Sequence, residues 1–183
     1  KNSVENLRQE GITNNVHLVG NTIVDSFNQI IDNGNFSKKV MELVSDNDEY
    51  LLVTLHRREN RELNFVNIWN QINEVSKDHK IIYIKHPSVP DSEKYLNDNI
   101  CLIDPVNYQD MLYLIKNSKG IISDSGGLPE EAVCAEKKIL ICRDPTERPE
   151  TIESGFGKLV EANVVDNLNF LFTKNINNLE NPY

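Results

Sequence analysis

Short, uninterrupted apolar runs alternate with amphipathic segments along most of this chain, and this alternation constrains the fold more than any other feature. A strand that is apolar on both faces needs cover on both sides, which is typical of parallel sheets whose connections are helices. The pattern therefore predicts an α/β fold, a Rossmann-like parallel sheet with helices on both faces. The expected strands are 16–19, 50–55, 80–85, 100–103, 120–123, 138–142 and 158–160.

The segments between these strands carry apolar residues at helical spacing. Residues 62–77 show the clearest stripe, in which Phe65, Ile68, Trp69, Ile72 and Val75 share one face. Residues 4–10 have the pattern of a helix end that Gly11 terminates. The other expected helices are 22–31, 92–96, 108–116, 128–135, 149–154 and 165–174.

The first expected strand, 16–19, stands apart from the regular pattern, which begins near Asn35. Because a lone strand needs partners, we expect it to belong to a sheet that this chain mostly lacks. Residues 1–34 are therefore interpreted as the end of one domain with a crossover segment, and residues 35–183 as a second domain.

Composition narrows the class of protein. The 183 residues carry a net charge of -9, which argues against general binding to nucleic acid,. No apolar run approaches the roughly 20 residues that span a bilayer, and the polar start is unlike a signal peptide. The three cysteines lie in apolar surroundings without a CxxC pair, so we interpret them as reduced core residues of a cytoplasmic protein,. The spacing of His, Cys and Asp residues suggests no metal site.

Polar clusters follow four of the expected strands, at 56–59, 123–127 and 143–148 and at His86 before Pro87. Ligands of open parallel sheets bind outside the carboxyl ends of the strands. Several polar clusters on that one edge therefore favour a single binding cleft.

The Ser/Gly turn at 123–127 leads from an apolar strand into a helix, an arrangement that offers free main-chain N–H groups to an anion,. We expect the amides of Ser125, Gly126 and Gly127 to hold a phosphate, with Arg148 as a charged clamp. The predicted ligand is a phosphorylated compound such as a nucleotide diphosphate. Alternatively, the turn is only a tight connection and Arg148 pairs with a neighbouring glutamate, at 147 or 150.

Three further residues have two readings each. The carboxylate of Glu131 could accept hydrogen bonds from ribose hydroxyls, or only interact with the helix dipole. His56 could contact a phosphate or transfer a proton, or be part of a surface charge cluster. His86 could contribute to the same cleft, or only fill a loop.

Taken together, these motifs resemble non-hydrolysing UDP-N-acetylglucosamine 2-epimerases. The similarity covers almost the whole chain in the same order. The matching segments are VGNTIVD at 19–25, VTLHRREN at 53–60, IYIKH at 82–86, LIDP at 102–105, SDSGG at 123–127 with EEA at 130–132, RDPTERPE at 143–150 and NPY at 181–183.

The resemblance implies one half of a GT-B two-domain architecture, namely the C-terminal, UDP-binding half. It implies that UDP-GlcNAc and UDP-ManNAc are interconverted by elimination and re-addition of UDP through 2-acetamidoglucal, without a metal or redox cofactor. The acid and base carboxylates of the family lie in the other half, so this chain alone is expected to be inactive. The complete enzyme is expected to be a cytoplasmic homodimer that serves the biosynthesis of cell-envelope polysaccharides.

The resemblance also assigns site residues. It places His56 at the substrate diphosphate as a catalytic residue, Glu131 at the ribose, and Val106 and Met111 near the uracil. Arg57 and His86 are the candidates for an allosteric site. The complete set of implied substrate-binding residues is His56, Val106, Met111, Ser125, Gly126, Gly127, Glu131 and Arg148.

The sequence departs from the family at a few positions, among them Met111 where an aromatic residue is frequent and Leu55 where glycine is usual. Three alternatives stay open at this point. They are the related hydrolysing epimerase, a non-catalytic nucleotide-sugar-binding module, and a GT-B glycosyltransferase.

Overall fold

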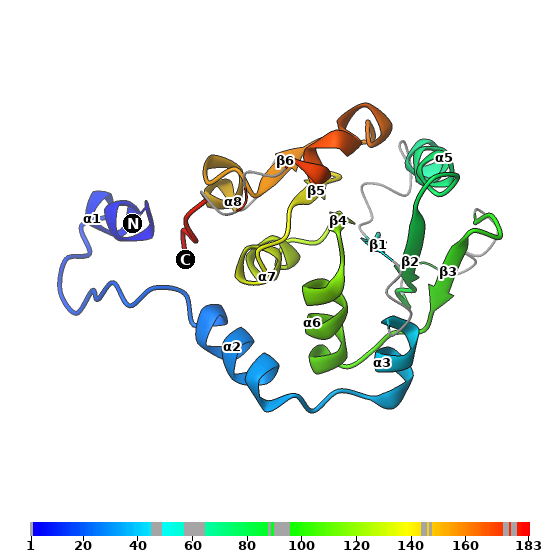
Figure 1. The fold of residues 1–183 in the computed structure, drawn as a ribbon. Coiled ribbons are helices and arrows are strands. Elements are labelled where there is room, and N and C mark those ends of the chain that lie inside the picture. Colours follow the sequence, from blue (N-terminus) through cyan, green and yellow to red (C-terminus); the bar gives the residue numbers. More distant parts are fainter. Residues whose placement is uncertain are drawn as a thin grey trace.

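A parallel six-stranded sheet forms the centre of the protein, in the strand order β3-β2-β1-β4-β5-β6 (Figure 1). The computed structural model describes residues 2–44, 49–56, 65–87, 89, 96–143, 146, 148–173, 176 and 179–183. The strands are β1 (Tyr50–Thr54), β2 (Lys80–Ile84), β3 (Ile100–Ile103), β4 (Gly120–Ser123), β5 (Ile139–Ile141) and β6 (Gly157–Leu159). These six strands lie within one residue of their predicted ends, and the predicted fold class is confirmed.

Helices cover both faces of the sheet, as the apolar strands require. One face packs against α5 and η2, and the other against α2, α3, α6 and α7. The helices are α1 (Asn2–Gln9), α2 (Ile23–Asn33), α3 (Lys38–Val44), α5 (Phe65–Val75), α6 (Tyr108–Asn117), α7 (Leu128–Cys134), α8 (Pro149–Glu153) and the 3₁₀ helix η2 (Val165–Phe172).

Strand β1 shows how the sequence alternates between two cores. Leu51 and Val53 belong to the cluster under α5, whereas Tyr50 and Leu52 belong to the cluster under α6 and α7. The Tyr50 hydroxyl donates a hydrogen bond of 2.6 Å to the carbonyl of Leu114 on α6. Because side chains alternate along a strand, a central strand of a covered sheet must be apolar at every position.

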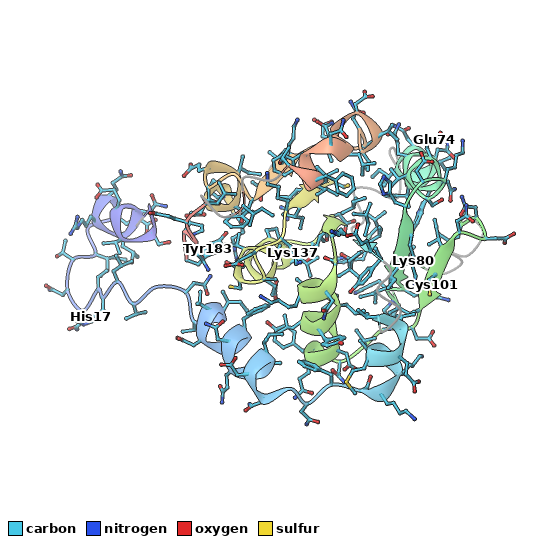
Figure 2. All side chains as sticks on the ribbon, in the orientation of Figure 1. His17, Glu74, Lys80, Cys101, Lys137 and Tyr183 are labelled. Atoms are coloured by element: carbon cyan, nitrogen blue, oxygen red, sulfur yellow. The ribbon has the colours of Figure 1, made fainter. Side chains whose placement is uncertain are left out.

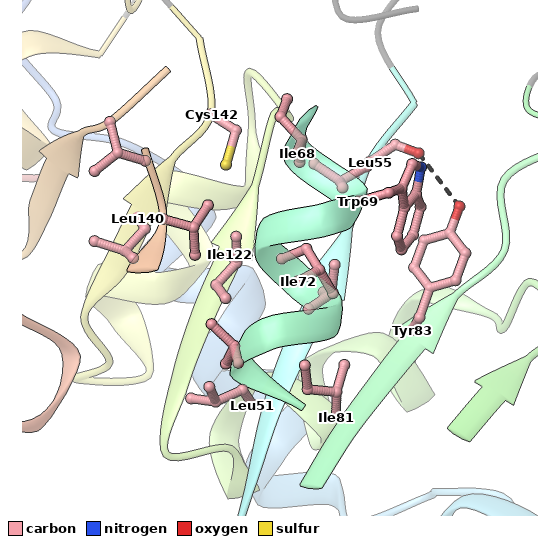
Figure 3. Packing of buried hydrophobic residues seen from close by; sticks show 14 of the residues in the cluster. Leu51, Leu55, Ile68, Trp69, Ile72, Ile81, Tyr83, Ile122, Leu140 and Cys142 are labelled. Carbon is pink, nitrogen blue, oxygen red and sulfur yellow. Dashed lines mark hydrogen bonds between the residues drawn. The ribbon is translucent and has the colours of Figure 1, made fainter. Parts of the chain in front are cut away.

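The core beneath α5 reaches the carboxyl edge of the sheet (Figure 3). Trp69 is 1% exposed, and its ring meets Tyr83 edge to face with 4.8 Å between the ring centroids. The Tyr83 hydroxyl points to the carbonyl of Leu55 at 3.5 Å, the interaction drawn as a dashed line in Figure 3. This packing holds the chain in place just before His56.

The prediction of a strand at 16–19 is wrong. No strand is formed there, and Leu18 and Val19 are 63% and 81% exposed. Figure 1 shows why, since this segment and α1 lie apart from the sheet, where no strand edge offers hydrogen-bond partners,. An apolar run can suit a strand, but only a neighbouring strand makes it one.

Other differences are smaller. Helix α3 was not predicted, and the helix expected at 165–174 is a 3₁₀ helix over Val165–Phe172. The short helix expected at 92–96 lies outside the described residues, apart from its last residue. The three cysteines, all in the described part of the chain, form no disulfide; Cys142 is fully buried, whereas Cys101 and Cys134 are partly exposed. Figure 2 places Cys101 on β3 and Tyr183 beside α8, where the Tyr183 hydroxyl lies 2.7 Å from the hydroxyl of Thr151.

Candidate functional site

The carboxyl ends of β1 and β4 bring together two segments far apart in the sequence. These strands pair in parallel with Thr54 opposite Ser123, and the strand order changes direction between them. His56 and Asp124 therefore come to the same edge of the sheet. Crevices at such a switch point are where ligands of open α/β sheets bind.

Asp124 holds His56 through both its main chain and its ring. The His56 amide donates to both carboxylate oxygens, at 3.0 Å to Oδ1 and 2.9 Å to Oδ2, and Nδ1 of the ring lies 3.1 Å from Oδ1. The Asp124 side chain is fully buried, whereas that of His56 is 31% exposed. A buried carboxylate therefore fixes the His56 ring, whereas positions 57–59 of the alternative charge cluster lie outside the described residues.

Two buried hydroxyls shape the Ser/Gly turn. Thr54 Oγ1 lies 2.7 Å from Ser123 Oγ, and the Ser125 amide donates to the same Ser123 oxygen at 3.0 Å. The Ser125 amide, expected to hold a phosphate, is thus already engaged within the turn. Among the described residues, none accepts a hydrogen bond from the amides of Gly126 and Gly127. These two amides are the ones that the turn leaves for a ligand.

A cavity of about 210 Å³ opens beside this turn. It brings together five of the predicted residues, His56, His86, Val106, Met111 and Ser125. The rings of His56 and His86 stack with 4.6 Å between their centroids. Binding sites for drug-sized ligands are typically about 300–1,000 Å³, so this cavity suits one portion of a nucleotide. Its remaining lining residues are Thr54, Leu55, Ile84, Lys85, Pro105 and Leu128.

A larger cavity of about 450 Å³ lies between α5 and the turn after β6. Its lining includes Asn67, Gln71 and Glu161, but none of the predicted site residues. It shares no lining residue with the cavity beside the Ser/Gly turn. Volume alone therefore does not locate the candidate site.

Glu131, on α7, lies next to Tyr108 at the start of α6. The Tyr108 hydroxyl donates to Glu131 Oε1 at 3.3 Å, while the buried Oε2 has no hydrogen-bond partner among the described residues. Burial raises the pKa of the Glu131 carboxyl. Burial, followed by the charge of Glu131, raises the pKa of Tyr108 to about 12. A buried acceptor without a donor costs about 1–3 kcal/mol, which a ligand hydroxyl at this oxygen would relieve.

Arg148 has a partner that the sequence analysis did not consider, Glu130 on α7. Its Nε donates to Glu130 Oε1 at 2.6 Å, and the side-chain amide of Asn21 donates to the same oxygen at 3.0 Å. Glu150 is described and is not this partner, whereas position 147 lies outside the described residues. The contact links the start of α8 to the first turn of α7 and to the segment before α2.

Arg57, the other candidate for an allosteric site, lies outside the described residues. Within the described ranges, no group of three His, Cys, Asp or Glu side chains is placed to hold a metal ion. None of the described helices has the length and apolar character needed to cross a membrane.

Comparison with known proteins decides the family. A family model described as UDP-N-acetylglucosamine 2-epimerase matches residues 1–183. The chain belongs to the UDP-N-acetylglucosamine 2-epimerase family. It is 37% identical over 179 residues to the UDP-N-acetylglucosamine 2-epimerase of Campylobacter jejuni, an alignment that covers 87% of this chain and 47% of that protein. The resemblance drawn from the sequence motifs is thereby confirmed.

Solved structures of UDP-N-acetylglucosamine 2-epimerases share the fold. The enzyme of Methanocaldococcus jannaschii in complex with UDP-GlcNAc and UDP is 35% identical with a TM-score of 0.83, covering 98% of this chain and 54% of that one. The enzyme of Neisseria meningitidis bound to UDP-GlcNAc is 32% identical with a TM-score of 0.85, covering 99% and 55%. The chain thus spans about half the length of the relatives it matches, as expected for one half of a GT-B architecture.

Proposed function

We propose that this chain is the UDP-binding half of an enzyme that interconverts UDP-GlcNAc and UDP-ManNAc. The observation that carries the proposal is the cavity at the β1–β4 switch point, which gathers His56, Val106, Met111 and Ser125 in a chain of this family. Relatives of the same fold bind UDP-GlcNAc and UDP. The proposal thus rests on the position of the cavity, its residue types and the family together.

The site divides into three parts. Val106 and Met111 give the cavity an apolar wall for the uracil, and Glu131 offers its partnerless Oε2 to a ribose hydroxyl. The diphosphate lies against the amides of Gly126 and Gly127. His56 and Arg148 supply the positive charge that a diphosphate needs in a chain of net charge -9,. Ser125 lines the cavity, and its amide is hydrogen-bonded within the turn.

The reaction removes the C2 proton and UDP from the sugar nucleotide to give 2-acetamidoglucal, and UDP then adds back with a proton on the opposite face of C2. Negative charge grows on the β-phosphate while the C1–O bond breaks. Donors that already point to this oxygen lower the barrier because they need no reorganisation. In this chain, that task falls to the Gly126 and Gly127 amides, His56 and Arg148, and we place the acid and base at C2 outside this chain.

Several wider assignments are part of the proposal. Residues 1–34 form the crossover from the other domain and residues 35–183 the nucleotide-binding domain. His86, which stacks on His56, is a candidate for a second, regulatory nucleotide-sugar site, together with Arg57, which lies outside the described residues. We further propose a cytoplasmic homodimer for the complete enzyme, without nucleic acid or membrane as a partner.

Titration calorimetry with UDP tests the proposal, using Gly127→Ala. A Cβ at Gly127 would meet no atom within 4 Å, and the main chain there has φ -91°, so the variant folds normally. The added methyl group keeps a diphosphate from the amide, and we expect UDP to bind about tenfold more weakly. Val66→Ala, at an exposed position of α5 on the other face, is the control with unchanged binding. Absence of UDP binding by the wild type contradicts the proposal.

Product analysis on the complete enzyme separates the alternatives. The proposed reaction converts UDP-GlcNAc to UDP-ManNAc and retains UDP, whereas a hydrolysing epimerase releases UDP and free ManNAc. A non-catalytic binding module binds UDP and turns over neither sugar nucleotide. A glycosyltransferase consumes UDP-GlcNAc only when an acceptor is added.

A further inference from the structure

We infer that Asp124 is a positioning residue that fixes the ring of His56, with Nδ1–H donating to its carboxylate and Nε2 presented to the ligand diphosphate. The inference rests on the function proposed above and adds a residue to it. Its basis is the contact between His56 Nδ1 and Asp124 Oδ1, 3.1 Å long. The same carboxylate accepts hydrogen bonds from the His56 main-chain amide at 3.0 and 2.9 Å, so Asp124 holds both the backbone and the ring of His56.

Burial gives this contact its strength. The Asp124 side chain is fully buried, and a buried carboxylate is costly unless donors compensate it,. The amide and the ring of His56 are two such donors. The neighbouring Cys142 thiol has its pKa raised by burial and then by the charge of Asp124, so it stays protonated and brings no second negative charge.

The chemistry of imidazole explains why the anchor matters for a ligand. Neutral histidine carries one N–H, and the partner of one ring nitrogen decides the state of the other. With Nδ1–H bonded to Asp124, the ring donates to a phosphate through Nε2 only as imidazolium, whose charge the buried carboxylate stabilises. Asp124 therefore couples a positive charge on His56 to the arrival of an anion.

The surroundings of the ring are consistent with this role. His86, at the end of β2, stacks on His56, and Lys85 lines the same cavity. Both are basic groups on the β2 side of the His56 ring. The carboxylate of Asp124 opposes them from the β4 side, and a bound diphosphate adds further negative charge.

The sequence alone could not show this pair. Asp124 stands in the Ser/Gly turn, where its sequence neighbours point to no histidine partner, and 68 positions separate it from His56. The sequence did place both His56 and Asp124 directly after an expected strand, and this was the available sign that they could meet at one edge of the sheet. The order of the strands decides that β1 and β4 are neighbours.

Asp124→Asn is the variant that tests the inference. Asparagine keeps the shape and can still accept from the His56 amide, but it carries no charge and can donate to Nδ1. In Ser-His-Asp triads the same exchange keeps the geometry and leaves the histidine in the wrong tautomer. The readout is the ¹⁵N chemical shifts of the imidazole, with the His56 signals assigned through His56→Gln. A second readout is calorimetry with UDP.

We expect wild-type His56 to carry a proton on Nδ1 and Asp124→Asn to lose it to Nε2. We expect UDP to bind about fivefold more weakly to the variant, since a charged donor is replaced by a neutral one. The matched control is Asp110→Asn, a buried aspartate at the start of α6 that holds the Ser37 amide and not His56. It leaves the His56 nitrogen signals and UDP affinity unchanged.

Identical His56 signals in wild type and Asp124→Asn overturn the inference. So does a changed tautomer with unchanged UDP affinity, since the ring position then has no consequence for the ligand. If Asp124→Asn does not fold, the ¹⁵N shifts of the wild-type His56 ring decide. An Nδ1 that carries no proton contradicts a hydrogen bond from Nδ1 to Asp124. If the wild type binds no UDP, the proposed function fails, while the nitrogen shifts still judge the position of the ring.

Discussion

Arg148 offers a quantitative test because its contact with Glu130 is well defined. Its Nε donates to Glu130 at 2.6 Å, its side chain is 36% exposed, and Asn21 donates to the same carboxylate oxygen. Glu130 therefore orients the guanidinium at the first turn of α7 and also offsets part of its charge. Removal of Arg148 takes away a donor for the diphosphate and leaves a carboxylate beside it.

The magnitude follows from this geometry. A hydrogen bond to a charged group contributes about 1.5–3 kcal/mol, and partial exposure of Arg148 places its contribution at the lower end. About 1.5 kcal/mol corresponds to UDP binding weakened about tenfold in Arg148→Ala. Glu130→Gln acts in the opposite direction and tightens UDP binding, because it weakens one contact of the guanidinium and removes a negative charge.

Titration calorimetry with UDP on both variants and on the double variant Arg148→Ala/Glu130→Gln measures these effects. Arg8→Ala is the control, since this arginine is exposed on α1 and pairs only loosely with Glu5 at 3.6 Å. Two results would refute the reasoning. One is unchanged UDP affinity in Arg148→Ala, and the other is equal weakening by Glu130→Gln, which would make the pair a structural link alone.

Two further predictions concern stability. Trp69→Ala empties a buried site against Tyr83, so we expect the free energy of unfolding to fall by about 3–5 kcal/mol in urea denaturation,; a loss below about 1 kcal/mol contradicts the described packing. Burial raises the pKa of Glu131 above its ordinary 4.5, so the folded state holds this proton more tightly and stability is lost as pH rises through the folded pKa,. Glu131→Gln is therefore more stable than wild type at neutral pH, an advantage that disappears below pH 4.5, and denaturation at both pH values checks it.

The strands were predictable because a central parallel strand is buried on both faces. β1 and β4 are buried at every position and apolar up to a last hydroxyl residue, and polar turns follow them, so their ends could be placed within one residue. Helix α3 was missed because only Val40 of its seven residues is buried, which leaves too weak a periodic pattern. The failed strand at 16–19 shows the limit of the same logic, since local pattern carries no information about partners.

The candidate site was predictable in its residue types and only partly in its contacts. His56, Val106, Met111 and Ser125 follow strands or begin the helices after them, and the structure gathers them around one cavity. The partner of each charged group was not predictable. Asp124 and Glu130 were placed in the right turn and helix, but their bonds to His56 and Arg148 cross 68 and 18 positions.

The sequence by itself determined the sheet, its covering helices and the edge where a phosphate ligand belongs, because burial and turn chemistry act over a few neighbouring residues. Only the tertiary structure decided which carboxylate holds His56 and which holds Arg148. These pairs depend on β1 lying beside β4 and on α7 meeting α8. Such contacts form only when helices and strands pack together, so the sequence of a single segment does not predict them.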